Sequence, residues 1–179
     1  MNNKQRILWI TQTGMMIALL ITSQAITAGL GNQFITGSIV NGILFVTTMM
    51  LGLYSGLTVA VLSNFFAFML GIGPAMFPLV PFVAAGNATL VLVYWLIAGK
   101  RSHIVAFPIA GVIAGSVAKF AALYVGIVLI AAPHLLNLPP AAPVYFMFSW
   151  PQLVTALLGG SVALNLFPLL KRALKRGTS

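Results

Sequence analysis

Lys119 lies in a long apolar stretch of a chain that contains no aspartate and no glutamate. No other charged side chain occurs between His103 and Ile130, and only 5% of the 179 residues are charged. Because a water-soluble domain carries about 25% charged residues, this chain cannot cover a water-exposed surface. We therefore predict an integral membrane protein in which Lys119 is buried without an acidic partner from its own chain. A charge inside a membrane is costly and marks a candidate functional site.

The other basic residues stand at the ends of six apolar runs. This pattern predicts an all-α, polytopic membrane protein, a bundle of six transmembrane helices forming one domain over residues 1–179. The runs cover approximately residues 7–28, 38–53, 57–72, 78–98, 104–132 and 150–170. Predicted breaks include a loop at Asn32–Gly37, a turn at Tyr54–Gly56, another turn at Gly99–Ser102 and a proline-rich segment from Pro133, where the prolines oppose helix continuation.

The distribution of basic residues predicts the orientation in the membrane. With six spans, every flanking lysine and arginine falls on the same side, so the positive-inside rule makes both termini cytoplasmic. The first run also resembles a signal peptide cleaved near Ser23–Ala25. It continues past that site to Leu30, which favours a retained helix.

Composition excludes several classes of function. The net charge of +9 is spread over helix ends, as topology requires, and not over a nucleic-acid-binding patch. The chain has no cysteine, and His103 and His134 are isolated, so no metal site and no intrinsic cofactor is expected. There is no phosphate-binding G-x-x-x-x-G-K-S/T motif and no acidic residue to hold Mg²⁺, so the chain cannot hydrolyse ATP itself. We expect it not to be an enzyme.

Polar residues inside the apolar runs are the candidate ligand-binding residues. Lys119 lies 18 residues after Arg101, roughly 27 Å along a helix, which predicts a place in the outer half of the membrane. Asn64, Asn87 and Gln152 either form ordinary interhelical hydrogen bonds or line a pocket together with Lys119. Aromatic residues near the last span form either an interfacial belt or a stacking wall over a bound ring; they are Tyr145, Phe146, Phe148 and Trp150.

Small residues recur every four positions in two of the runs. In the first run they are Gly14, Ala18 and Thr22, which make a flat stripe for close approach of another helix, either within the chain or on a partner protein. In the fifth run they are Gly111 and Gly115, for which internal packing is the favoured reading.

In size, charge and predicted topology the whole chain resembles a substrate-binding S component of an energy-coupling factor vitamin transporter. At the residue level the resemblance rests on Gly14-Met15-Met16-Ile17-Ala18, which is similar to the small-x-x-x-small motif of that family, with glycine in place of the more usual first alanine. The resemblance implies a multi-pass protein of a prokaryotic cell membrane that binds a vitamin near its outer surface.

The resemblance also implies partners and site residues. Gly14, Ala18 and Thr22 would dock onto a membrane scaffold subunit bound to two ATPase subunits, which use ATP and Mg²⁺. The loop containing Asn32, Gln33, Phe34 and Thr36 would cover the ligand, although a plain solvated loop is the alternative. The chain most resembles the cobalamin-type members of this family. Pantothenate, folate-like and pyrimidine ligands are the alternatives.

Two other functions fit the same sequence. One is a small transporter or channel driven by a gradient, and the other is a membrane assembly protein that binds no small ligand. For Lys119 three partners stay open at this point: an anionic ligand, backbone carbonyls with water, or a residue of another subunit.

Overall fold

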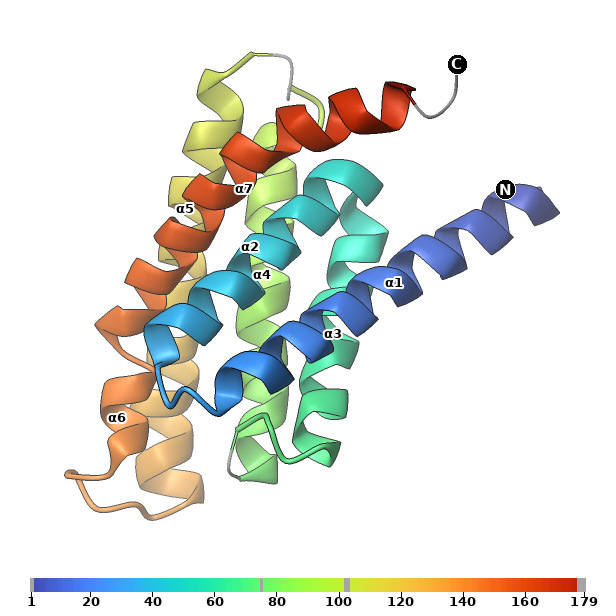
Figure 1. Ribbon diagram of the computed structural model, residues 1–179. Coiled ribbons are helices and arrows are strands. Elements are labelled where there is room, and N and C mark those ends of the chain that lie inside the picture. The colour runs from blue at the N-terminus through green and yellow to red at the C-terminus, as the bar shows by residue number, and fades with distance from the viewer. Residues whose placement is uncertain (1, 75, 102–103, 177–179) are drawn as a thin grey trace.

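The computed structural model describes residues 2–74, 76–101 and 104–176, and within these ranges the chain is all-helical, with 85% helix and no strand. The predicted all-α class is confirmed. The long helices, shown in Figure 1, are α1 (Asn3–Ala28), α2 (Gln33–Leu51), α3 (Leu53–Met69), α4 (Val80–Ala98), α5 (Ala106–Leu123) and α7 (Trp150–Arg176). The shorter segments are a 3₁₀ turn η1 (Phe77–Leu79), a π-helical continuation of α5 called η2 (Tyr124–Leu135), and α6 (Pro143–Met147).

Five helical segments in the described part of the chain are long and apolar enough to cross a membrane. The continuous helix Ala106–Leu135 has 30 residues, more than the ~20 that a hydrocarbon core of ~30 Å requires. α3 is also apolar but shorter, at 17 residues. The apolar helices therefore indicate a membrane-embedded protein, as the sequence predicts.

Two predicted connections between helices are wrong. The segment predicted as a loop at Asn32–Gly37 is the start of α2, because Asn32 caps this helix and its Oδ1 accepts hydrogen bonds from the backbone N–H groups of Phe34 and Ile35. The turn predicted at Tyr54–Gly56 lies inside α3. The chain turns instead at Gly52, whose φ of 84° is in a region that glycine adopts without strain.

The proline-rich segment does not end the fifth helix where the sequence predicts. The helix continues through Pro133 to Leu135, because it changes at Tyr124 to the wider π form, in which hydrogen bonds skip one further residue. The chain then turns at Asn137, whose φ is 49°. The last helix likewise continues beyond the predicted end at Leu170, to Arg176, with Pro168 inside it.

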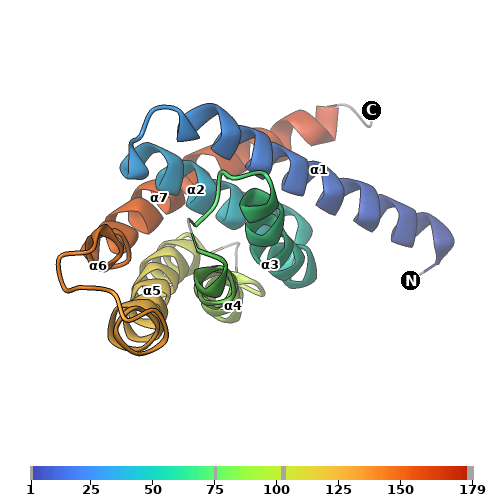
Figure 2. The same cartoon turned by 90° about the horizontal axis from the view of Figure 1, so that it is seen from below.

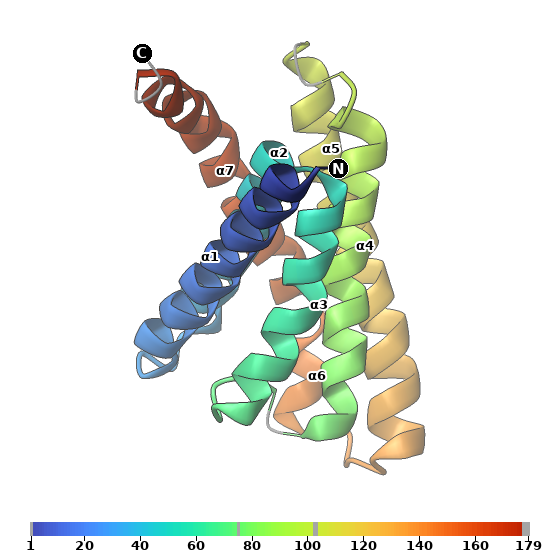
Figure 3. The ribbon, with the colours of Figure 1, turned by 90° about the vertical axis from the view of Figure 1, so that its right-hand side faces the viewer.

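Basic residues gather at one end of the bundle, here called the basic end. They lie at the start of α1, directly after α4 and near the end of α7; they are Lys4, Arg6, Lys100, Arg101, Lys171 and Arg172. Figures 1 and 3 show both chain termini and the α4–α5 connection at this end, while the other helix connections except α2–α3 lie at the opposite end. Ser102 and His103 lie outside the described residues.

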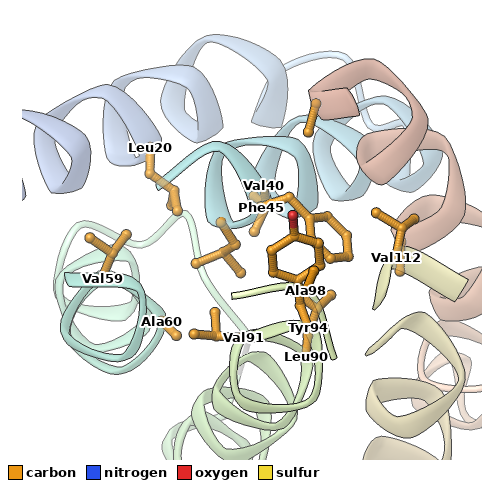
Figure 4. Close-up of a cluster of buried hydrophobic side chains, with 13 residues drawn as sticks. Leu20, Val40, Phe45, Val59, Ala60, Leu90, Val91, Tyr94, Ala98 and Val112 are labelled. Atoms are coloured by element: carbon orange, nitrogen blue, oxygen red, sulfur yellow. The ribbon is translucent and has the colours of Figure 1, made fainter. Parts of the chain in front are cut away.

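The helices enclose two apolar clusters. The larger one, drawn in Figure 4, joins α1, α2, α3, α4, α5 and α7 and includes Phe45 and Tyr94, whose ring centroids lie 5.4 Å apart in an edge-to-face arrangement. The smaller one lies toward the opposite end and includes Leu79, Leu123 and Ile127. α1 lies on the outside of the bundle and packs mainly against α2 and α3 (Figure 2).

Glycine allows the helices to approach closely at two places. α2 and α7 cross at Gly42 and Gly159, where a Cβ atom on Gly159 would lie 2.6 Å from the Gly42 backbone nitrogen. On α5, a Cβ atom on Gly111 would lie 3.0 Å from a Tyr94 ring carbon, and one on Gly115 would lie 3.0 Å from the Leu90 carbonyl oxygen, both in α4. The Gly111-x-x-x-Gly115 motif therefore serves internal packing, as favoured from the sequence.

We predict that Gly159→Ala destabilises the bundle by about 1–3 kcal/mol, because backbone atoms at the crossing cannot move aside for a methyl group. Gly14→Ala is the matched control, since no atom lies within 4 Å of a Cβ at that position. Thermal unfolding in detergent measures both. Equal melting temperatures for the two variants would contradict the close α2–α7 contact.

Candidate functional site: a buried lysine among asparagines

Lys119 is buried in the interior of the bundle, with 3% of its surface exposed. Its Nζ donates hydrogen bonds of 2.6 Å to Oδ1 of Asn41 in α2 and to Oδ1 of Asn87 in α4. Both asparagines are almost completely buried. The charge is therefore stabilised by two neutral amide oxygens, which bring partial negative charge close to the ammonium and satisfy two of its three donors.

The asparagines extend this contact into a network. Asn87 Nδ2 donates to Oδ1 of Asn64 in α3 over 3.3 Å, and Asn64 Nδ2 donates back to the carbonyl of Ala60 in its own helix. On the other side, Asn41 Nδ2 donates to Oγ1 of Thr155 in α7 over 3.3 Å. Hydrogen bonds thus connect side chains of five helices, α2, α3, α4, α5 and α7.

This polar network separates the two apolar clusters. Along α5, Lys119 lies between Val112 of the larger cluster and Leu123 of the smaller one. Along α4, Asn87 precedes Leu90 of the larger cluster. Apolar side chains offer no hydrogen-bond partners, so each buried amide bonds to another member of the network or to a backbone carbonyl, which restricts the side-chain positions.

The structure brings together three of the residues singled out in the sequence, Asn64, Asn87 and Lys119. It adds two that the sequence analysis missed, Asn41 and Thr155. Like Asn64, Asn41 is an amide side chain inside an apolar run, so it was a candidate on the same grounds. Thr155 has no such signal, because threonine is common in membrane helices and usually bonds to its own backbone.

The partner of Lys119 differs from the expectation. Amide oxygens of its own chain were not among the three partners considered, yet they hold the ammonium in this structure. Lys119 is the fourteenth residue of the 30-residue helix Ala106–Leu135, so it lies near the middle of that helix. Its place in the outer half of the membrane stays a prediction.

A second group of predicted residues meets at the opposite end, around α6. Gln33 Nε2 at the start of α2 and Gln152 Nε2 in α7 both donate to the carbonyl of Met147, with distances of 2.5 Å and 2.9 Å. The rings of Phe34 and Trp150 lie beside each other, with centroids 5.8 Å apart. α6 is thereby fastened to the first turn of α2 and the first turn of α7.

The remaining predicted ligand residues surround this group without joining it. Asn32 is exposed and caps α2, and Thr36 is half-buried in the first turns of the same helix. The hydroxyl of Tyr145 donates to the carbonyl of Leu138 over 3.2 Å, which braces the loop before α6. One backbone link connects the two groups, because Thr155 Oγ1 donates to the carbonyl of Gln152 over 3.1 Å.

The small residues of α1 face away from the bundle. The buried residues of this helix are Thr13, Leu20 and Thr27, and Thr13 Oγ1 donates to Ser55 Oγ of α3 over 2.9 Å. At 100° per residue, the stripe of Gly14, Ala18 and Thr22 lies about 160° around the helix from them. All three stripe residues are exposed, so the alternative that the stripe packs within its own chain is wrong.

We predict that Asn41→Leu destabilises the protein by about 1–3 kcal/mol, because it leaves the Lys119 ammonium with one fewer acceptor in an apolar interior. Asn165→Leu is the control, since Asn165 is exposed on α7 and bonds only to its own helix. In a Lys119→Met background the same Asn41→Leu change should cost less than about 1 kcal/mol, because the charge is gone. Unfolding in detergent measures this cycle, and additive effects would show that Asn41 does not stabilise the charge.

No family model, no curated protein and no solved structure matches this chain. The residues of the Lys119 network and of the group around α6 define the chemistry of the site. They provide one buried cation, three amides that both donate and accept hydrogen bonds, and an aromatic group at one end of the bundle.

Proposed function

We propose that this protein is the membrane-embedded, substrate-binding S component of an energy-coupling factor transporter for a vitamin or related micronutrient. It crosses a prokaryotic cell membrane six times, and both termini are cytoplasmic. The gathering of basic residues at one end of the bundle supports this orientation. The opposite end, with α6 and the aromatic group, then faces outward.

The observation that carries the proposal is the free face of α1. A membrane helix that presents Gly14, Ala18 and Thr22 away from its own bundle offers a flat surface for the backbone of another helix. Thr13 and Leu20 on the reverse side hold the helix to the bundle. This is the arrangement that docking onto a separate membrane scaffold requires, and the scaffold's two ATPase subunits supply the ATP hydrolysis.

The interior network provides the recognition chemistry. Lys119 pairs with phosphate or carboxylate groups, and the asparagine amides match a ligand that carries amides of its own. Cobalamin, which combines a phosphodiester with many amides, is the first candidate. Binding exchanges hydrogen bonds within the network for hydrogen bonds to the ligand, so few buried polar groups lose their partners.

Ligand entry from the outer side involves the residues around α6. Gln33 and Gln152 both hold the Met147 carbonyl, and Phe34 lies against Trp150. Separation of α6 from the start of α2 breaks the Gln33–Met147 hydrogen bond, and movement of the start of α7 away from α2 breaks the Phe34–Trp150 contact. Together these movements expose aromatic faces on which a ring system can stack. The predicted covering segment is thus a helix start with a capping asparagine and not a flexible loop.

Reconstitution into vesicles tests the function. The protein alone should bind a vitamin, detected by native mass spectrometry after gentle purification, and should transport it only when the scaffold and ATPase subunits and ATP are present. Ala18→Leu should prevent co-purification with the scaffold while ligand binding persists, because the added side chain fills the docking face. Val117→Leu, on an exposed face of α5, is the control. Uptake by the protein alone would show a gradient-driven transporter, and absence of any bound ligand would favour an assembly protein.

We predict that Lys119→Ala weakens binding of the ligand at least ~10-fold, or about 1.4 kcal/mol, because the anionic group loses its cation. Lys119→Met keeps a long, unbranched side chain without the charge and should weaken binding equally while keeping the fold. Isothermal titration calorimetry with the co-purified vitamin measures both. Unchanged affinity together with a lower melting temperature would make Lys119 a structural residue only.

A further inference from the structure

A cavity of about 750 Å³ lies at the basic end, between the start of α1 and the α2–α3 turn. Its apolar wall includes Ile10, Leu51 and Leu53, and its polar and aromatic wall includes Arg6, Trp9 and Tyr54. None of the residues that line the cavity belongs to the Lys119 network or to the group around α6, so the proposed vitamin site does not use it.

Arg6 occupies a place on α1 where a packing residue would be expected. The buried residues Thr13, Leu20 and Thr27 recur every seven positions, and Arg6 is seven positions before Thr13. It therefore lies on the side of the helix that faces the bundle further along. Figures 1 and 2 show that the start of α1 leans away from the other helices. The Arg6 guanidinium thus lies on the same face of α1 as Thr13 and Leu20, at a point where no other helix of the described chain packs against that face.

No acidic side chain of this chain can pair with Arg6. The sequence contains no aspartate or glutamate, so no side-chain carboxylate is available to pair with the guanidinium. Guanidinium groups bind phosphate oxygens in a bidentate manner. The composition of the cavity and the charge of Arg6 are therefore complementary to an amphipathic anion with a phosphate group.

The position of the cavity identifies the source of that phosphate. Trp9, Tyr54 and Trp95 are amphipathic aromatic residues of the kind that gather at the membrane–water interface, and Tyr54 is 78% exposed. Along α1 the cavity lining changes from polar at Arg6 to apolar at Ile10, one helical turn further from the basic end, in the same order as a glycerophospholipid changes from headgroup to acyl chain. We infer that this cavity binds one anionic phospholipid, with the phosphate at Arg6 and the upper acyl chain against Ile10.

Tryptophan fluorescence in vesicles tests this inference with the full chain. The protein has three tryptophans, and Trp150→Phe leaves only Trp9 and Trp95, both of which line the cavity. In phosphatidylcholine vesicles, brominated phosphatidylglycerol should quench these two indoles with an apparent affinity about fivefold higher than that of brominated phosphatidylcholine. Equal quenching by the two lipids would overturn the inference.

Substitutions of single basic residues test whether Arg6 causes the preference for phosphatidylglycerol. Arg6→Gln should abolish the preference for phosphatidylglycerol, and Lys171→Gln should preserve it, because Lys171 lies at the same end over the ring of Phe167, outside the cavity. An unchanged preference in Arg6→Gln would overturn the inference. So would displacement of the brominated lipid by millimolar inorganic phosphate, which would assign the site to a soluble anion. Loss of scaffold binding in Arg6→Gln with the lipid preference intact would assign the cavity to a protein partner instead.

Discussion

The hydrogen bonds from the Lys119 ammonium to Asn41 and Asn87 determine how the interior of this bundle is built. An amide oxygen carries only a partial negative charge, so a single amide stabilises an ammonium less than a carboxylate does. Here two amide oxygens accept hydrogen bonds from the same Lys119 Nζ. The N–H group of each amide also needs an acceptor. Asn41 donates to Thr155, and Asn87 donates to Asn64. Burial of a single charge therefore links five helices, because a buried polar group that loses its partner is costly.

α1 is the long helix that stays outside this network. Its one interhelical side-chain hydrogen bond among the described residues joins Thr13 to Ser55, and its apolar contacts with the larger cluster come from Met16, Ile17 and Leu20. Lipid chains are as apolar as the side chains that they would replace, so apolar contact holds helices together less strongly in a membrane than in water. The bundle thus consists of a polar-linked group of five helices and a helix attached through packing.

The sequence predicted the all-helical class and the approximate position of every long helix, because apolar runs of membrane length are a strong local signal. It failed where the outcome depends on local geometry that composition does not encode. Gly52 and not Tyr54–Gly56 makes the α2–α3 turn, and a π-helical stretch carries the chain past Pro133. The Lys119 network was only partly predictable: Asn41 is 78 residues away, and nothing local indicates that these two side chains meet.

The two faces of α1 have a consequence for how such a protein can change over evolutionary time. Residues that hold the helix to the bundle, such as Leu20, are buried, and residues of the outward stripe, such as Ala18, are exposed on the other side of the helix. Substitutions on one side therefore leave the other side undisturbed. Lineages with different interior networks can keep one common outward surface, and a single lineage can exchange that surface without repacking its core.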